Sequence, residues 1–383
     1  MKKILCGLVP FNAFLIAALF GRHFYTPDTP CYVAGARLLF GLPGGRDCDF
    51  RILKPLALIV PGLLERATGI EAQYGFLIQN LLFYFLASTL IFQLIGMVFR
   101  DELKAFWATV MFITAPPLML YGLAYMTDMP AWFFGILGIY VTLRVYSKLT
   151  EKPEYAIFIG FIMGFGFLWK ESAVTGAVFF GAYVLLSNLP GKVKAGLCVY
   201  GVVGFAIPVL ISSGLVYNRF HYTFWGWYAF IQTKPYGNSY TLSEFIREVT
   251  RTFDVVWLLF VAGVFRFLRD FFQRNTDASE VRFLIASGAT ILLWPIWPYP
   301  SNRLFYLSCP FLVSVGANAV ELFGKERWTF LVLLAVFLNL VIVALWSALG
   351  LRGLVYILGI AYSAIMIWCL RSIAGSQQAS KCG

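Results

Sequence analysis

The chain has 383 residues, of which 60% are hydrophobic, 18% aromatic and only 13% charged. That composition excludes a water-soluble globular protein, because too few polar residues are present to cover its surface. The formal net charge of +11 requires no nucleic acid partner, since basic residues collect in the cytoplasmic loops of membrane proteins. We therefore expect an integral membrane protein of the all-α polytopic class, with the lipid bilayer as a partner.

Apolar segments long enough to cross the roughly 30 Å hydrocarbon layer recur along the whole chain. They predict about twelve transmembrane helices in a single integral-membrane domain, residues 1–383. We interpret the first as a retained span, because no small-x-small cleavage site for a signal peptide follows it. In chain order, the expected spans are 4–21, 74–98, 105–125, 129–146, 155–169, 173–188, 195–217, 254–271, 283–298, 304–322, 328–348 and 353–370.

Residues 51–70, RILKPLALIVPGLLERATGI, are apolar enough to be mistaken for a further span. The segment also carries prolines and charged residues, which favours an amphipathic helix lying at the membrane interface. With this segment outside the membrane, the basic residues gather on the side of the N-terminus. The short connections on the other side carry only Lys170, Arg303 and Arg352. This asymmetry predicts that both termini lie in the cytoplasm.

Two outer loops are long, residues 22–73 with the amphipathic helix and residues 218–253, whereas the other connections are short. Long loops in a compact protein are usually functional or disordered. Both loops are aromatic and apolar, and we expect them to be ordered against the membrane surface. Cys31 and Cys48 share the first loop, where an oxidising compartment would allow a disulfide, and whether they pair stays open.

Charged residues gather at the outer ends of the predicted spans. By the expected topology they lie at similar depth on one face, where charges are costly unless they are paired or hydrated. Such a set is a candidate functional site. Its members are Asp28, Asp128, Lys170, Glu171 and Arg303.

Each of these residues also has a purely structural interpretation. Asp28 and Asp128 are placed to cap the helices that follow them, and a capping carboxylate can still face a cavity. Lys170 and Glu171 are adjacent and could neutralise one another. Arg303 could be an ordinary interface anchor. These alternatives stay open at the level of the sequence.

The second long outer loop mixes aromatic rings with polar groups, a combination suited to binding a sugar or a lipid phosphate. An interfacial belt of aromatic residues is the alternative explanation. The candidate substrate-binding residues there are His221, Tyr222, Trp225 and Lys234. Elsewhere, the sequence contains no nucleotide-binding loop, no nucleophile elbow and no cysteine spacing typical of a zinc site.

Five segments together resemble membrane glycosyltransferases of the GT-C superfamily, which includes protein mannosyltransferases and lipid A aminoarabinose transferases. The segment DTPCYVAGARLL resembles the first outer loop of that superfamily, and FRILKPLALIVPGLLE resembles its loop helix. Later blocks, in the family order, resemble LAYMTDMPAWFFGILGIYVTLRVYSK, GFIMGFGFLWKESAVTGAVFFGAYVLL and SNRLFYLSCPFLVSVGANAVE. The resemblance implies a GT-C-like fold with interfacial helices in the first outer loop.

The resemblance also implies a polyprenyl-phosphate-linked sugar donor, an acid in the first outer loop as catalyst, and inversion at the anomeric carbon. The acceptor would be a lipid, a glycan or a protein. Many relatives carry two adjacent acids where this chain has only Asp28 in PDTP, which puts in doubt a metal site in this loop. Whether a divalent cation takes part stays open, and no other cofactor is implied.

We assign roles on this basis. Asp28 is the expected general base, which takes a proton from the acceptor hydroxyl. Asp128 is expected to orient the acceptor or to hold a cation. Lys170 and Arg303 are expected to bind the donor phosphate, and Glu171 to position Lys170.

Two other functions stay open at this stage. A ligase for lipid-linked oligosaccharides would use the same class of membrane protein and the same outer charges. A lipid or solute transporter would require polar residues near the bilayer midplane, whereas the charges here stop at one boundary. We expect a prokaryotic cytoplasmic membrane, with the active site on its outer face.

Overall fold

The computed structural model describes residues 1–44, 49–232, 241–273, 277–296, 301–349, 357–358 and 360–369. Within these ranges the secondary structure is entirely helical, which confirms the predicted all-α class. The α-helices are α1 Lys2–Phe20, α2 Thr29–Phe40, α3 Pro55–Thr68, α4 Ala72–Phe99, α5 Glu102–Ile113, α6 Pro116–Tyr121, α7 Asp128–Val145, α8 Tyr155–Phe167, α9 Thr175–Leu185, α10 Gly191–Phe220, α11 Phe224–Gln232, α12 Leu242–Phe253, α13 Val256–Phe272, α14 Ala278–Gly288, α15 Asn302–Phe305, α16 Cys309–Asn318, α17 Val320–Phe323 and α18 Lys325–Leu349.

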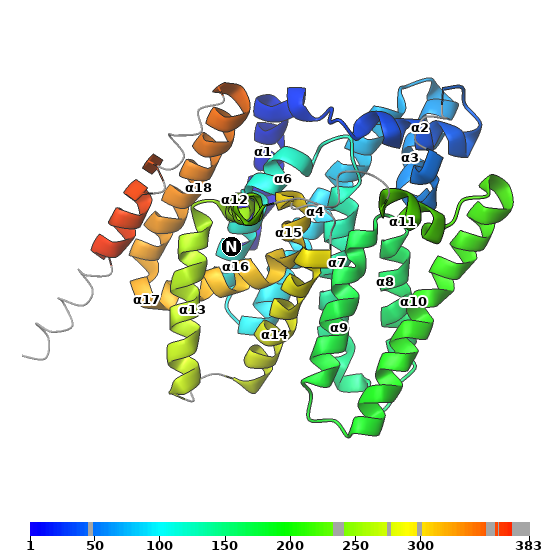
Figure 1. The fold of residues 1–383 in the computed structure, drawn as a ribbon. Coiled ribbons are helices and arrows are strands. Elements are labelled where there is room, and N and C mark those ends of the chain that lie inside the picture. Colours follow the sequence, from blue (N-terminus) through cyan, green and yellow to red (C-terminus); the bar gives the residue numbers. More distant parts are fainter. Residues whose placement is uncertain are drawn as a thin grey trace, which may run out of the picture.

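Six helical segments in the described part of the chain are long and apolar enough to cross a membrane: Lys2–His23, Ala72–Phe99, Asp128–Lys148, Gly191–Phe220, Asn302–Phe323 and Lys325–Leu345. Three shorter apolar helices in the described part of the chain overlap other expected spans: Tyr155–Phe167, Glu171–Leu185 and Ile360–Cys369. Figure 1 shows α2 and α3 at one end of the molecule and the connection between α9 and α10 at the opposite end. The loop 22–73 therefore contains two short helices that lie at the end of the helical bundle.

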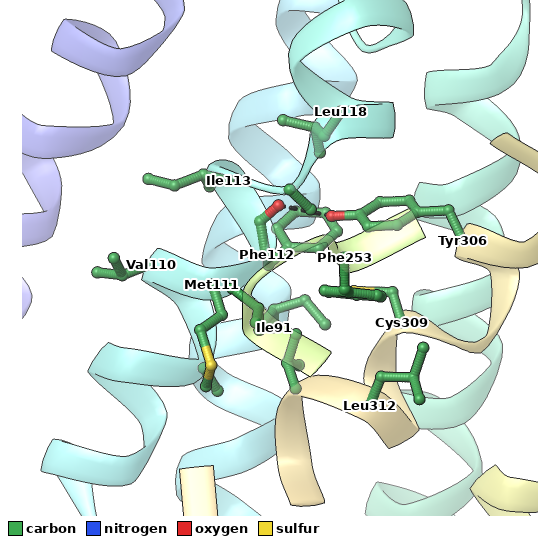
Figure 2. Packing of buried hydrophobic residues seen from close by; sticks show 14 of the residues in the cluster. Ile91, Val110, Met111, Phe112, Ile113, Leu118, Phe253, Tyr306, Cys309 and Leu312 are labelled. Atoms are coloured by element: carbon green, nitrogen blue, oxygen red, sulfur yellow. Dashed lines mark hydrogen bonds between the residues drawn. The ribbon is translucent and has the colours of Figure 1, made fainter. Parts of the chain in front are cut away.

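The third expected span is broken into α5 and α6 by two prolines at 116–117. Prolines have no N–H, so the carbonyls of Phe112 and Ile113 lose their usual helical donors. The hydroxyl of Tyr306 donates to the oxygen of Phe112 at 2.5 Å, and the amide of Asn12 donates to that of Ile113 at 2.8 Å. Figure 2 shows the first of these bonds among the buried hydrophobic side chains. Both side chains thereby stabilise the break between the helices.

Helices α8 and α10 lie in unusually close contact because glycines face one another. A Cβ atom on Gly160 would lie 2.0 Å from the carbonyl oxygen of Gly201, and one on Gly204 would lie 2.0 Å from that of Ile157. Small residues at such positions let helix backbones approach closely, as is typical of membrane helices. The glycines therefore fix α8 against the long helix α10.

Candidate active site

Asp28 lies at the N-cap position of α2, but its side chain makes no capping hydrogen bond. Instead, its Oδ2 accepts a hydrogen bond from Nη2 of Arg303 at 2.9 Å. Its Oδ1 lies 3.4 Å from Nη2 of Arg51, which belongs to a short 3₁₀-helix, Asp49–Leu53. The side chain of Asp28 is 35% exposed. The carboxylate is therefore held by two arginines and still faces solvent.

The two arginines determine the ionisation of Asp28. Partial burial acts to raise the pKa of this carboxyl group, but the guanidinium groups of Arg51 and Arg303 outweigh it and hold the pKa below its usual value. Asp28 is therefore ionised at neutral pH and available to accept a proton.

Arg51 is itself fixed by Tyr32 on α2. Its Nη1 donates to the hydroxyl of Tyr32 at 3.0 Å, and its Cζ lies 4.2 Å from the centre of that ring. Tyr32 is 1% exposed and packs edge-on against Phe76 of α4, with 5.9 Å between ring centres. The first outer loop thus holds Arg51 rigidly beside Asp28 through a hydrogen bond and a cation–π contact.

Asp128 is the first residue of α7 and is 1% exposed. Its Oδ1 accepts a hydrogen bond from Nζ of Lys170 at 2.5 Å, and its Oδ2 lies 3.8 Å from Nη1 of Arg303. The same guanidinium also binds Asp28. Arg303 therefore lies between the two predicted catalytic acids and links them.

Lys170 and Glu171 differ from the expected arrangement, in which Glu171 positions Lys170. The backbone at Lys170 is extended, with φ −165° and ψ 140°, and successive side chains of extended backbone point in opposite directions. Lys170 accordingly binds Asp128, whereas Glu171 forms a close ion pair with Lys54. The two neighbours therefore have separate partners.

Lys170 is 4% exposed and is therefore enclosed by protein, whereas the sequence suggests a hydrated position. It follows helix α8, Tyr155–Phe167, and lies inside the helical bundle. Burial acts to lower the pKa of Lys170, but the carboxylate of Asp128 outweighs it and raises the pKa above its usual value.

Lys54 connects the first outer loop with the second. It is 3% exposed, and its Nζ lies 5.1 Å from the centre of the Trp227 ring on α11. Helix α10 has 30 residues and is about 45 Å long, which exceeds the hydrocarbon thickness. Its length carries α11 to the end of the bundle where Lys54 and Glu171 lie.

The backbone around Arg303 is anchored by an aromatic residue of α7. Nε1 of Trp132 donates to the carbonyl oxygen of Arg303 at 3.3 Å. The guanidinium also approaches the sulfur of Met126, at 3.5 Å from Nη1, and the ring of Tyr121, at 5.8 Å from its centre. These contacts fix the position of the charge between the two acids.

The segment before Asp128 is not helical and is held by Asn80 of α4. Nδ2 of Asn80 donates to the carbonyl oxygens of Ala124 and Met126, at 2.6 and 3.0 Å. These carbonyls have no helical partner, so the buried amide replaces the hydrogen bonds that a helix would supply. Asn80 thereby fixes the segment that leads into Asp128.

Seven charged side chains around Asp28 form a cluster whose charges sum to +1, because it contains four cations and three carboxylates. Such an excess in a partly buried site favours an anionic ligand, and guanidinium groups bind phosphates in a bidentate manner. The cluster consists of Arg51, Lys54, Lys170 and Arg303 with Asp28, Asp128 and Glu171.

The predicted residues of the second loop are less closely associated with this cluster. His221 ends α10 with a φ of 60° and is exposed, and Trp225 is 79% exposed. Lys234 lies outside the described residues. Tyr222 packs against a small apolar cluster that contains Leu53. Tyr222 thereby contacts the first outer loop.

Arg51 and Lys54 are site residues that sequence reasoning did not select. Both lie in the segment that resembles the family loop helix. Their position as basic residues just before Pro55 is the sequence pattern that could have indicated a role in the site. Cys31 is disulfide-bonded, and Cys48, whose pairing with it the sequence leaves open, lies outside the described residues. Within the described ranges, no three His, Cys, Asp or Glu side chains are placed to hold a metal ion together.

Comparisons with known proteins support the fold. No protein-family model and no curated protein matches the chain. Its fold is similar to that in the crystal structure of the Archaeoglobus fulgidus oligosaccharyltransferase in the apo form, with a TM-score of 0.53 and 12% sequence identity. The match covers 95% of this chain and 56% of that one, so the chain spans about half the length of the solved protein. The architecture is therefore the GT-C type predicted from the sequence.

Proposed function

We propose that the protein is a membrane glycosyltransferase that moves a monosaccharide from a polyprenyl phosphate to a hydroxyl acceptor at the outer membrane face. The observation that carries this proposal is the position of Asp28, a partly exposed carboxylate set among cations that carry a net positive charge. A base and an anion-binding group lie side by side in one site, as transfer from a sugar phosphate requires. The GT-C-type fold supports the same class of reaction.

In the proposed reaction, the acceptor oxygen forms a bond to the anomeric carbon while its proton passes to Asp28. The bond between that carbon and the phosphate oxygen breaks, and its electron pair goes to the phosphate. The donor phosphodiester leaves as a polyprenyl phosphate monoester, and attack from the opposite side inverts the anomeric configuration. Asp28 is the base because it is the most exposed of the three carboxylates.

Cations are required because negative charge grows on the leaving phosphate. Arg51 and Arg303 have side chains that are 14% exposed, whereas that of Lys170 is 6% exposed and already bound to Asp128. We therefore assign the first contact with the donor phosphate to the two arginines. Lys170 holds Asp128 in place and adds to the positive potential of the site.

The test is sugar transfer by purified protein in liposomes, with a radiolabelled polyprenyl-phosphate sugar and a lipid extract as acceptor. Asp28→Asn should lower the rate by a factor on the order of 10² or more, the usual effect of losing a general base. Asp101→Asn is the matched control, because Asp101 caps α5 through the backbone N–H groups of Leu103 and Lys104 and Asn caps equally well. Transfer by Asp28→Asn at the parental rate would refute the assignment.

Transfer of a whole oligosaccharide is the second candidate, because the similar solved structure is that of an oligosaccharyltransferase. Mass spectrometry of the products distinguishes the two. One added sugar per acceptor supports the monosaccharide donor, and a larger, uniform mass increase from a lipid-linked oligosaccharide supports the alternative.

A further inference from the structure

We infer that the guanidinium of Arg303 takes the place of a divalent cation between Asp28 and Asp128, so that the proposed transfer requires no metal ion. A second consequence follows: removal of this guanidinium should create a divalent-cation site between the two carboxylates. The inference rests on the proposed function for its first part only. The second part concerns binding and can be measured without any transfer.

The geometry at Arg303 places one cation against two carboxylates, one just before α2 and one at the start of α7. Nη2 lies 2.9 Å from Oδ2 of Asp28, and Nη1 lies 3.8 Å from Oδ2 of Asp128. A metal ion shared by two carboxylates would neutralise the same two charges. The guanidinium is always protonated in proteins, so it provides this neutralisation permanently.

The remaining oxygens of both acids also have cationic partners. Oδ1 of Asp28 faces Arg51 at 3.4 Å, and Oδ1 of Asp128 binds Lys170 at 2.5 Å. A divalent ion between the two Oδ2 atoms would have to displace Arg303 and enter a cluster whose seven charged side chains already sum to +1. Like charges in a partly buried site repel strongly, so the donor set does not fit a metal ion while Arg303 is present.

Loss of the guanidinium removes this excess of positive charge. Three cations would then face three carboxylates, and the Oδ2 atoms of Asp28 and Asp128 would be left without their present cation. Carboxylate oxygens that point toward one another, with room for water, are typical ligands of Mg²⁺ and Mn²⁺. Arg303→Ala removes the side chain that separates the two oxygens and provides that room.

The first arm of the test uses the unaltered protein in liposomes. Transfer should change by less than about twofold in excess EDTA or on addition of Mg²⁺ or Mn²⁺, since no step depends on a metal. If EDTA abolishes transfer and added Mg²⁺ or Mn²⁺ restores it, the inference is wrong.

The second arm measures Mn²⁺ binding by electron paramagnetic resonance on purified, ligand-free protein. Arg303→Ala should bind one Mn²⁺ that the unaltered protein does not bind, and Arg303→Ala combined with Asp128→Asn should lose it. Arg51→Ala is the matched control, because it removes one guanidinium from the same carboxylate but leaves Arg303 between the acids. Should Arg303→Ala fail to fold, Arg303→Ser gives the same readout, because its small side chain also leaves room for the ion.

Equal Mn²⁺ binding by Arg303→Ala and the unaltered protein would refute the latent site. Transfer by Arg303→Ala should fall at least tenfold and recover in part when Mn²⁺ is added. A protein that shows no transfer in any form would contradict the proposed function, and the binding arm would still decide the role of the guanidinium.

Discussion

At the scale of single residues, the two arginines around Asp28 determine how the site responds to pH. Because they hold the pKa of this carboxyl below its usual value, the base should stay ionised well into the acidic range. Transfer should therefore not decline between pH 8 and 5 through this group. The same depressed pKa stabilises the folded protein at pH values above the usual pKa of an aspartate, and this contribution is lost as pH falls through the folded value.

Substitution of one arginine tests this explanation. Arg51→Gln should move the acidic limb of the pH–rate profile upward, because one of the charges that depress the pKa of Asp28 is gone. The profile is measured for both proteins under identical lipid conditions. An acidic limb at the same pH in both would mean that another group controls it.

Two adjacent amides on α4 give opposite predictions for stability. Gln79 is 3% exposed, and neither atom of its amide has a hydrogen-bond partner in the described part of the protein, whereas Asn80 donates two bonds. Gln79→Met keeps the volume and should stabilise the protein by about 1–2 kcal/mol, while Asn80→Leu should destabilise it by about 1–3 kcal/mol. Thermal unfolding in detergent measures both, and destabilisation by Gln79→Met would contradict the role assigned to its unpaired amide.

At the scale of helices, the contact between α8 and α10 determines where Lys170 lies. A methyl group on Gly160 would collide with the backbone at Gly201, so Gly160→Ala should force the helices apart and destabilise the protein by about 1–3 kcal/mol. Gly196→Ala is the matched control on α10, since a Cβ there meets nothing within 4 Å. Equal unfolding temperatures for the two variants would show that the close approach contributes little.

The sequence was sufficient to predict that Asp28, Asp128, Lys170 and Arg303 gather at one end, because alternate connections of a helical bundle return to the same side. It was not sufficient to predict how they pair. The pairing depends on the extended backbone at Lys170 and on how the segment that carries Arg51 folds back over α2. Both are set by tertiary contacts and leave no periodic signal in the sequence.

The break after α5 was missed for a related reason. The apolar run through residues 105–125 predicts one continuous span, and the two prolines alone are compatible with a kinked helix. The structure ends the helix because Asn12 and Tyr306, distant in sequence, supply the hydrogen bonds that the prolines cannot. Only the folded bundle brings these donors to the break.

At the scale of the whole molecule, the site can act as proposed only if both long loops face the outside. The basic residues predict this orientation, and the connection between α9 and α10 lies at the opposite end from α2 and α3 (Figure 1). Single cysteines at Leu42 and Ser243 should therefore react with a membrane-impermeant maleimide in intact cells. Cysteines at Glu151 and Ser279 should react only after the membrane is opened, with exposed Cys6 replaced beforehand. Labelling of Leu42 and Glu151 from the same side would mean that α3 or a neighbouring segment crosses the membrane, and the charged cluster would then not face the outside.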